Sequence, residues 1–518
     1  MCALALSIRL FKSSMAGNFY AAVAASIDSG PERLVLETHD GSTYIRADLA
    51  RESARFARLM VEAGAVRGDR IAVQVDKSPA SLFLYLGCLR AGLVYLPLNT
   101  AYQRGELSYF LDDAQPRIVV CRPQSFELMR EISAGYATVF TLDEDGHGSL
   151  ANAAAALAGE FATVDSAPDD LAVIVYTSGT TGRSKGAMVT HRNLLSNARV
   201  LVDYWGFSDR DVLLHALPVF HIHGLFVANH CVLLSGGKLL WHRKFDANMV
   251  LRDLSRATVM MGVPTFYTRL LAERAFDREA CHSVRLFISG SAPLQLETFK
   301  EFHTRTGQSI LERYGMSEAG MICSNPLNAE RRGGSVGFPL PGVSVRVVDD
   351  HDRPLPRGGV GGIQIKGENV FAGYWRMPDR TREEFTADGY FRTGDIGSFD
   401  ADGYLSLVGR AKDLIISGGY NVYPKEIELA LDALPGVTES AVIGIPHPDF
   451  GEAVAAVVVA RKGAKLDPAA LIAELKKNLA NYKVPKQVYV VDDLPRNAMG
   501  KVQKALLRER YGKQPHGK

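Results

Sequence analysis

The sequence predicts an α/β protein with a large N-terminal domain of mixed or parallel sheets flanked by helices, a small antiparallel β unit, and a small α+β C-terminal domain. Short apolar runs alternate with helical patterns before residue 336, which is typical of buried parallel strands joined by crossover helices. Beyond that point apolar and polar residues alternate between Pro and Gly turns, which indicates antiparallel strands. The 518 residues exceed what one hydrophobic core usually holds, so we expect more than one domain.

Local patterns predict the strands of the N-terminal part. Apolar runs at residues 70–75, 117–121 and 171–176 are short and continuous, as expected of strands buried on both faces. Residues 343–349 and 362–366 alternate instead, as expected of strands with one solvated face. These last two runs make up the predicted antiparallel unit.

Beyond Gly409 the pattern changes to a compact α+β unit. Pro424 stands where a helix can begin, and Ile427, Leu431 and Leu434 follow at helical spacing. The remaining predicted elements are two strands and a helix, at residues 440–445, 454–459 and 469–479.

These patterns divide the chain into three parts. Residues 1–14 carry Arg9 and Lys12 but no acidic residue, so we expect a disordered extension or a weak organellar targeting sequence. Residues 15–411 form the predicted core domain, and residues 412–518 form the predicted C-terminal domain.

Composition excludes several classes of partner. With 59 basic and 57 acidic residues, the chain has no general attraction to nucleic acid or to a membrane surface. Its longest apolar region, at residues 81–90, is interrupted by Arg90 well short of a bilayer span. The six cysteines form no C-x-x-C pair, so we expect neither a zinc site nor disulfides, and we expect a cytoplasmic protein. The expected partner is a small molecule.

One loop has the composition of a phosphate-binding site. Residues 177–186, TSGTTGRSKG, directly follow an apolar strand pattern. Glycines let backbone N–H groups approach phosphate oxygens, and Lys185 adds a positive charge. The loop is not of the Walker type, because Gly179 and Gly182 are too closely spaced and Gly186 follows the lysine. On local sequence alone, a plain turn is an equal alternative.

Six further segments show a family resemblance, which in turn indicates a role for this loop. In the expected order, they resemble the signature segments of the adenylate-forming enzymes, which are the acyl-CoA synthetases, luciferases and adenylation domains. The segments are LPVFH at 217–221, SGSAP at 289–293, YGMSE at 314–318, YFRTGD at 390–395, GRAKDLIISGG at 409–419 and PRNAMGK at 495–501. The resemblance implies an AMP-forming ligase that joins a carboxylate to AMP, releases pyrophosphate, and then transfers the acyl group to the thiol of coenzyme A.

The same resemblance implies which residues bind ATP. The loop would hold the β- and γ-phosphates, Glu318 would be a ligand of Mg²⁺, and Ser317 would face the α-phosphate. Asp395 would accept hydrogen bonds from the ribose hydroxyls, with Arg410 as its companion. The implied ATP-binding set is Thr177, Ser178, Gly179, Thr180, Thr181, Gly182, Lys185, Gly290, Ser291, Ala292, Tyr314, Ser317, Asp395 and Arg410.

The resemblance also implies a rotation between two half-reactions. Lys501 would reach the carboxylate and the α-phosphate during adenylation, as a catalytic residue together with Glu318 and Ser317. Lys412 would be the hinge of a mobile C-terminal domain. After rotation, Ser417 and the two glycines that follow it would form the tunnel for the pantetheine arm of coenzyme A. Those glycines are Gly418 and Gly419.

The residues expected around the acyl pocket indicate which acid the chain binds. Arg269 follows the VPT segment that approaches this pocket in the family, and His221 and Ser289 lie in neighbouring segments. A guanidinium near the pocket is costly unless it is paired, and a second carboxylate on the substrate would pair it. Arg285 is the other candidate for this distal carboxylate. The alternative for Arg269 is a solvent-exposed position on a helix, near Glu273.

Within the superfamily, the chain most resembles the malonyl-CoA synthetases, through HALPVFHIHGLF, MGVPTFYTRLL and LERYGMSEAGMICSNPL. We therefore expect a ligase that makes malonyl-CoA from malonate, ATP and coenzyme A, with methylmalonate as a slower substrate. Two alternatives stay open. One is an aryl- or medium-chain acyl-CoA synthetase in which Arg269 points outward. The other is a stand-alone adenylation enzyme that loads a carrier protein.

Overall fold

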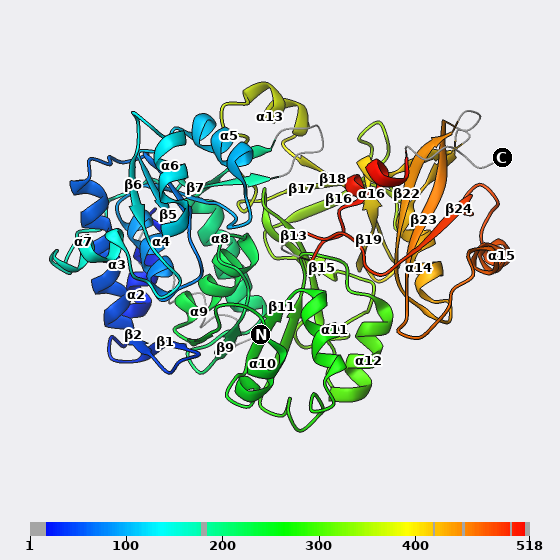
Figure 1. The fold of residues 1–518 in the computed structure, drawn as a ribbon, viewed down its shortest axis with the longest axis horizontal. Coiled ribbons are helices and arrows are strands. Elements are labelled where there is room, and N and C mark those ends of the chain that lie inside the picture. The colour runs from blue at the N-terminus through cyan, green and yellow to red at the C-terminus, as the bar shows by residue number, and fades with distance from the viewer. Residues whose placement is uncertain (1–16, 178–183, 418–419, 448–450, 498–499, 513–518) are drawn as a thin grey trace.

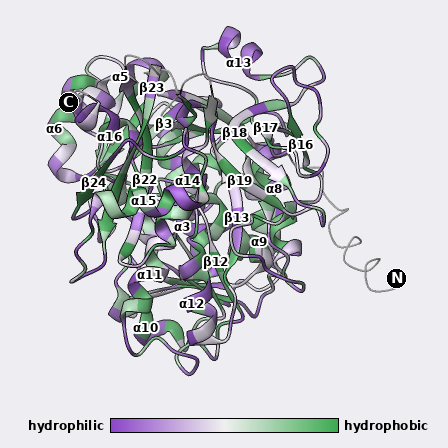
Figure 2. Cartoon of the chain, turned by 90° about the vertical axis from the view of Figure 1, so that its right-hand side faces the viewer, coloured by the Kyte–Doolittle hydropathy of each residue, from purple (hydrophilic) through white to green (hydrophobic). Residues whose placement is uncertain are grey.

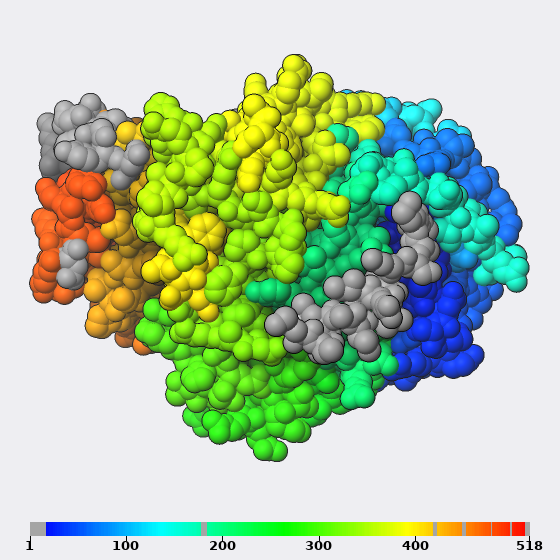
Figure 3. Space-filling view, turned by 180° about the vertical axis from the view of Figure 1, so that it is seen from behind, coloured from blue at the N-terminus to red at the C-terminus, as the bar shows by residue number. Residues whose placement is uncertain are grey.

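The computed structural model describes residues 17–177, 184–417, 420–447, 451–497 and 500–512. Figure 1 shows the chain running from the blue and cyan part through the green and yellow centre to the orange and red C-terminal part. The described residues form sheets of six, nine, four and five strands. From behind, the space-filling view shows the orange C-terminal part packed against the yellow and green centre (Figure 3).

The first sheet has six strands in the order β6-β5-β3-β4-β7-β8. All its neighbours are parallel except β7 and β8, which are antiparallel and joined by the glycine-rich loop. The strands are β3 (Arg70–Gln74), β4 (Val94–Pro97), β5 (Ile118–Cys121), β6 (Thr138–Thr141), β7 (Leu171–Thr177) and β8 (Lys185–Thr190).

The second sheet has nine strands in the order β15-β14-β13-β12-β11-β9-β10-β1-β2. Its central strands are parallel, so their carboxyl ends lie along one edge, where ligands of open α/β sheets usually bind. The strands are β1 (Leu34–Thr38), β2 (Thr43–Ile45), β9 (Val212–His215), β10 (Lys238–Trp241), β11 (Val259–Gly262), β12 (Leu286–Ser289), β13 (Leu311–Met316), β14 (Gly320–Ser324) and β15 (Phe338–Pro339).

Helices cover these two sheets. Residues 81–89 of α4 are all buried, as expected of a helix that is apolar all round. Asn18, Ser78 and Thr190 start α2, α4 and α8 as side-chain N-caps. The helices of this part are α2 (Phe19–Asp28), α3 (Arg46–Glu62), α4 (Pro79–Arg90), α5 (Arg104–Ala114), η1 (Pro123–Ser125), α6 (Phe126–Ile132), α7 (Ser149–Ala155), α8 (His191–Tyr204), the π-helix η2 (His223–Ala228), α9 (Asn229–Ser235), α10 (Ala247–Leu254), α11 (Pro264–Ala272) and α12 (Leu296–Thr306).

The remaining two sheets are smaller. The four-stranded sheet is fully antiparallel, in the order β16-β17-β18-β19, and the last sheet belongs to the C-terminal part. Their elements are β16 (Ser344–Val348), β17 (Gly361–Lys366), α13 (Pro378–Glu384), β18 (Phe391–Phe399), β19 (Leu405–Arg410), η3 (Ala411–Asp413), β20 (Ile415–Ser417), β21 (Tyr420–Val422), α14 (Pro424–Asp432), β22 (Val437–His447), β23 (Gly451–Ala460), α15 (Pro468–Asn478), β24 (Gln487–Val491) and α16 (Lys504–Tyr511).

The predicted fold class is confirmed. Every strand predicted from a local pattern is present, with bounds shifted by a few residues, and the antiparallel unit is the four-stranded sheet. The helix that begins at Pro424 ends at Asp432, so Leu434 lies beyond it. Figure 2 shows that the strands of the sheets are largely hydrophobic, whereas many segments toward the outside of the molecule are hydrophilic.

Membrane-spanning helices and disulfides can both be assessed over the described residues. None of their helices is long and apolar enough to cross a membrane. The cysteines that the structure describes are buried and are not joined in disulfides. They are Cys88, Cys121, Cys231, Cys281 and Cys323.

Two glycines with a left-handed backbone, Gly337 and Gly358, differ in the space around them. Gly337 has a φ of 80°, and a Cβ built there would lie 2.1 Å from the carbonyl oxygen of Ser324, whereas Gly358 has a φ of 85° and open space around it. Left-handed backbone alone costs a non-glycine residue roughly 1–2 kcal/mol. We expect Gly337→Ala to lower the melting temperature well below that of Gly358→Ala, because only the former adds a clash. Equal melting temperatures would contradict this packing.

Candidate active site

Side chains from three separate segments meet beside the carboxyl end of β13. The Tyr314 hydroxyl donates a hydrogen bond to Oδ2 of Asp395 on β18, at 2.5 Å. Arg410 lies opposite Asp395 on β19, and its Nε is 3.0 Å from Oδ1. The pKa of Arg410 is raised, chiefly by the Asp395 charge. Both oxygens of this buried carboxylate are therefore oriented, and each keeps a lone pair that can accept a ligand hydroxyl.

Glu318 lies in the turn between β13 and β14, next to Ser317, and is 7% exposed. The hydroxyls of Thr177 and Tyr374 each donate to its Oε1 at 3.3 Å. Burial raises the pKa of this carboxyl group. A buried carboxylate that receives only neutral donors is suited to a divalent cation, and Mg²⁺ binds proteins through one or two carboxylates plus waters and phosphate oxygens.

The base of the glycine-rich loop lies beside Glu318. Thr177 ends β7 and faces Lys185 at the start of β8. The buried Lys185 ammonium is 3.3 Å from Oε1 of Glu384 and lies over the ring of Tyr374, 4.2 Å from its centre. Tyr374 thus contacts both Glu318 and Lys185. The predicted phosphate-binding residues of the loop tip lie outside the described residues; they are Ser178, Gly179, Thr180, Thr181 and Gly182.

A strained segment follows β12. Gly290, Ser291 and Ala292 leave the carboxyl end of this strand, and Ser291 has a φ of 72°, which is unusual for a residue other than glycine. The Ser291 hydroxyl is 3.2 Å from Nδ1 of His223. Such strain persists where surrounding structure holds it, and it is enriched at ligand-binding sites.

The C-terminal part contributes Lys501. Its loop packs on α11, because a Cβ built on Gly500 would lie 3.2 Å from Oγ1 of Thr265. Burial, together with the nearby positive charge of Arg410, lowers the pKa of the Lys501 ammonium to about 8. The negative charge of Asp395 acts in the opposite direction and raises this pKa. Lys501 therefore lies within electrostatic range of the Asp395–Arg410 pair.

Lys412 and Ser417 lie at the junction of the two parts. Lys412 is exposed in η3, between the last strand of the four-stranded sheet and the first strand of the C-terminal sheet. Ser417 is buried at the end of β20. Gly418 and Gly419 lie outside the described residues.

Arg313 is not among the residues predicted from the sequence, yet its guanidinium lies against Gly290, directly after β12. It belongs to β13 and is 4% exposed. A Cβ built on Gly290 would lie 2.5 Å from its Cζ, so only glycine allows this packing. Burial lowers the pKa of Arg313 to about 9. Within the described part of the chain, no residue forms an ion pair or hydrogen bond with this guanidinium.

Other polar atoms near Arg313 also have no partner among the described residues. They are Oγ of Ser289, which lies beside Gly290 at the end of β12, and Nε2 of His223. Within Arg313 itself, Nε and Nη2 are buried without partners. Burial, reinforced by Arg313, lowers the pKa of His221 to about 4, and that of His223 falls for the same reasons. Buried polar groups are normally paired, so this cluster is a place for a polar ligand.

Arg285 does not belong to this cluster, so its position gives no support to the expectation that it binds the distal carboxylate. Arg285 precedes β12 and thus lies at the opposite end of that strand from Ser289. Its Nε and Nη2 bond to the two oxygens of Asp211, at 2.8 and 2.9 Å. Its other N–H groups donate to the carbonyl oxygens of Trp205 and Gly206. Proximity in sequence did not reveal which end of the strand faces the site.

Arg269 is also outside the cluster, contrary to the prediction. It is exposed on α11, whose Tyr267, Leu270 and Leu271 are buried. The first turn of this helix, not its last, approaches the site. The structure therefore shows the solvent-exposed alternative for Arg269.

The sequence did hold a signal for Arg313. Residues 309–316, SILERYGM, read as a short strand, and two consecutive charges interrupt it. Charged residues are rarely buried unless paired, so a charge inside a buried strand marks either a salt bridge or a ligand. Glu312, its neighbour, points to the other face and accepts the backbone N–H of Leu294 at 3.0 Å.

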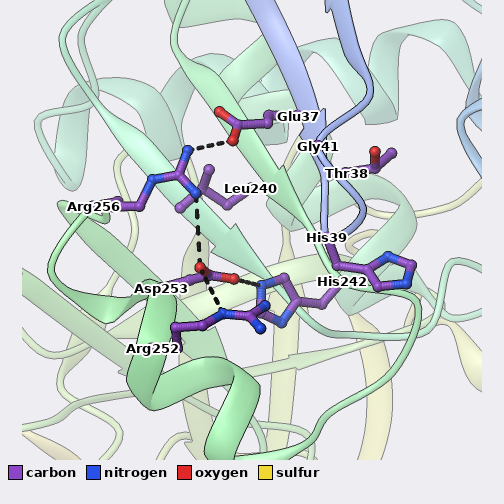
Figure 4. Close-up of a pocket in the computed structure, with 9 residues that line it drawn as sticks. All are labelled: Glu37, Thr38, His39, Gly41, Leu240, His242, Arg252, Asp253 and Arg256. Carbon is purple, nitrogen blue, oxygen red and sulfur yellow. Dashed lines mark hydrogen bonds and ion pairs between the residues drawn. The ribbon is translucent and has the colours of Figure 1, made fainter.

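A separate polar cavity lies away from this site. It has a volume of about 160 Å³ and is lined by His242, Asp253 and Arg256, among other residues. Figure 4 shows Arg256 reaching both Glu37 and Asp253, and Asp253 bonded to the ring of His242. Its charged groups are thus largely paired with one another, unlike Arg313.

Comparisons with known proteins identify the family. The model of the AMP-binding enzyme family matches residues 23–375, and the model of the AMP-binding enzyme C-terminal domain matches residues 426–501. A malonate–CoA ligase of Arabidopsis thaliana is 33% identical over 549 residues, covering 96% of this chain and 90% of the relative. A sulfoacetate–CoA ligase of Cupriavidus necator is 37% identical, with 94% and 96% covered. A feruloyl-CoA synthase of Amycolatopsis is 36% identical, with 92% and 95% covered.

Solved structures agree with this. ATP-bound MatB from Rhodopseudomonas palustris is 53% identical and superimposes with a TM-score of 0.95, over 96% of this chain and 99% of that chain. Apo MatB from the same organism has the same identity and coverage but a TM-score of 0.84. The present structure is therefore more similar to the ATP-bound form. Family models and relatives span nearly the whole chain, and the chain belongs to the AMP-binding enzyme family.

Proposed function

We propose that this chain is an AMP-forming malonate–CoA ligase. In the first half-reaction, a carboxylate oxygen of malonate attacks the α-phosphorus of ATP and expels pyrophosphate. In the second, the thiol of coenzyme A, having lost its proton, attacks the acyl carbon of malonyl-AMP and expels AMP. The observation that carries the choice of acid is the buried Arg313 guanidinium, which has no acidic partner among the described residues.

The nucleotide roles rest on the geometry around Asp395 and Glu318. Asp395, oriented by Tyr314 and Arg410, would accept the ribose hydroxyls. Glu318 would hold Mg²⁺, which when bound supplies positive charge to the phosphates. Lys185 and the loop after β7 would contact the β- and γ-phosphates, with Lys185 exchanging its contact with Glu384 for phosphate oxygen.

The two half-reactions would use two positions of the C-terminal domain. Lys501, which is close to Arg410, would act in the first half-reaction and neutralise charge between the carboxylate and the α-phosphate. Lys412 in η3 would be the hinge between residues 15–411 and 412–518. Rotation there would withdraw Lys501 and bring in Ser417 with the two glycines after it as the wall of the coenzyme A tunnel.

The acid pocket would bind the distal carboxylate of malonate through Arg313. A carboxylate would satisfy the unpartnered Nε and Nη2 in the paired geometry that guanidinium favours. The hydroxyl of Ser289 and the neutral imidazole of His223 are further polar groups beside it. His221 lies in the same environment, and its low pKa keeps it neutral at pH 7.

The relatives define the competing substrates. A sulfoacetate–CoA ligase and a feruloyl-CoA synthase are both similar to this chain over almost its full length. A sulfonate would also pair with Arg313, whereas an aryl acid would leave the guanidinium desolvated and unpaired, at a cost of a few kcal/mol. A carrier protein in place of coenzyme A is the remaining alternative.

The proposal is tested by thioester formation and AMP release with malonate, methylmalonate, sulfoacetate, acetate, octanoate and ferulate. We expect malonate to give the highest kcat/KM, with methylmalonate within about 10- to 200-fold of it. Sulfoacetate as the preferred acid would keep Arg313 in its role and change the substrate. Preference for octanoate or ferulate would overturn the proposed acid. A carrier protein used in place of coenzyme A would overturn the acceptor.

Arg313→Met tests the distal carboxylate directly. We expect a fall in kcat/KM for malonate of about 10²-fold, because a buried charged pair that loses one partner costs about 2–5 kcal/mol. Activity with propionate, which lacks the second carboxylate, should change little. Arg269→Met, which removes an exposed arginine, is the matched control and should retain malonate activity. Loss of activity in the control but not in Arg313→Met would reverse the assignment.

Lys501→Ala should separate the half-reactions. We expect pyrophosphate release to fall by about 10²- to 10³-fold, because a charge directed at the transition state is lost. Thioester formation from supplied malonyl-adenylate should be nearly unchanged. Lys477→Ala, an exposed lysine paired with Glu474 on α15, serves as the control. Equal damage to both half-reactions would remove Lys501 from this role.

The pH dependence of adenylation follows from the same lysine. The pKa of Lys501 is lowered to about 8 from an ordinary 10.5, so the ammonium is present below about pH 8 and is lost as pH rises through it. We expect kcat/KM for the first half-reaction, which reports the free enzyme, to fall above about pH 8. In Lys501→Arg, whose guanidinium stays charged, the residual activity should lose this alkaline fall. A profile flat to about pH 10 in the parent enzyme would contradict the assignment.

A further inference from the structure

Another buried basic residue, outside the site described above, lies between the two large sheets. Lys77 follows β3 of the six-stranded sheet, yet its ammonium contacts β9 and β10 of the nine-stranded sheet. Its Nζ is 2.7 Å from the carbonyl oxygen of His215 and 2.8 Å from Nδ1 of the same residue. It also lies 4.3 Å from the ring centre of Trp241. Lys77 is 6% exposed, and burial lowers its pKa well below the ordinary value.

The contacts of His215 fix its tautomer. Nε2 is 3.0 Å from the carbonyl oxygen of Gly224, which can only accept, so Nε2 carries the proton. Nδ1 is then the acceptor, and Lys77 donates to it. Burial and the Lys77 charge both lower the pKa of His215, which keeps the ring neutral. The three groups form one directed chain, from Lys77 through His215 to the carbonyl of Gly224.

This chain ends on the segment that carries the pocket histidines. Gly224 lies in the π-helix η2, directly after His223, whose ring contacts Ser291. A Cβ built on Gly224 would lie 2.1 Å from the carbonyl oxygen of Pro218, so the segment is packed tightly on its other side. Single π-helical turns occur frequently at functional sites, and their irregular hydrogen bonding needs support.

The backbone of His215 is also hydrogen-bonded, on the side away from η2. Its carbonyl oxygen accepts a second hydrogen bond from the backbone N–H of His242, at 3.1 Å. The ring of His242 bonds to Asp253 at 2.9 Å, at the wall of the cavity in Figure 4. The titratable groups near Lys77 and His215 thus include His242, with Asp253 behind it, and His223 on the side of η2. None of the carboxylates that the structure describes forms an ion pair with Lys77 within 4.0 Å.

An apolar side chain at position 77 would pack between the sheets without the desolvation cost of an amine. The amine is directed instead along a chain that reaches η2. We propose that Lys77 and His215 are positioning residues for the acid substrate, which hold the π-helical segment so that His221 and His223 face the pocket beside Arg313. This inference rests on the proposed acid activation but not on which acid is preferred.

The test compares Lys77→Met, which keeps most of the length of the side chain but removes the amine, with His215→Gln, whose amide can still donate to Gly224. His191→Gln is the matched control, since His191 is another buried histidine that accepts a backbone N–H, that of Phe19, but forms no hydrogen bond with η2 among the described residues. Initial rates are measured with the best acid from the substrate panel, under saturating ATP and then under saturating acid. Melting temperatures are recorded for all variants.

We expect Lys77→Met to lower kcat/KM for the acid by about tenfold or more, because displacements of about 1 Å near reacting groups cost up to about 10²-fold. The KM for ATP should stay within about twofold. His215→Gln should retain more activity than His215→Ala, and the Lys77→Met, His215→Ala double variant should be no worse than His215→Ala, because both act through one contact. The control should melt lower but keep the KM for the acid.

Two results would overturn the inference. One is a Lys77→Met enzyme with a lower melting temperature and parental KM for the acid, which is the signature of a purely structural role. The other is additive losses in the double variant. If Lys77→Met does not fold, the comparison of His215→Gln with His215→Ala decides alone. A parent enzyme inactive with every acid would instead contradict the proposed function, and the two failures are thereby distinguished.

Discussion

The guanidinium of Arg313 packs against Gly290 at the centre of the proposed acid-binding region, and the neighbouring polar groups surround its charge. Its burial removes it from water, and no acidic residue in the described part of the chain forms an ion pair with it. The same charge helps to keep His221 and His223 neutral, so that they can act as hydrogen-bonding groups and not as competing cations. An isolated buried charge is tolerated only where the surroundings are rigid, and a ligand of opposite charge gains most from such preorganisation.

Rigidity comes from the way the sheets meet. β12 and β13 place Gly290 and Arg313 side by side, and the four-stranded sheet brings Asp395 and Arg410 against Tyr314. The reaction joins two anions, so a site that catalyses it needs several cations at fixed positions. Arg313 and Arg410 are fixed by strands of the N-terminal part, whereas Lys501 comes from the C-terminal part. In the proposed mechanism, a cation on a separate unit would be withdrawn after adenylation, and one site would then serve two reactions.

Much of the fold could be predicted from the sequence, because buried strands and antiparallel strands have different hydrophobic patterns and each strand follows its own local signal. The nucleotide side was predictable for another reason: its residues lie within short continuous segments such as YGMSE and TGD. The acyl side was harder, because Arg269 and Arg285 lie near the right segments but point elsewhere. Position along a strand or around a helix decides the direction of a side chain, and sequence proximity does not. Lys77 shows the same limit, since its partners lie more than a hundred residues away, on another sheet.

The most direct measurement of the central claim is a crystal structure with malonate and a non-hydrolysable ATP analogue bound. The account predicts that the distal carboxylate lies about 3 Å from Nε and Nη2 of Arg313, with the reacting carboxylate toward the α-phosphate. A distal carboxylate found in solvent or beside Arg269, with Arg313 still unpaired, would contradict it.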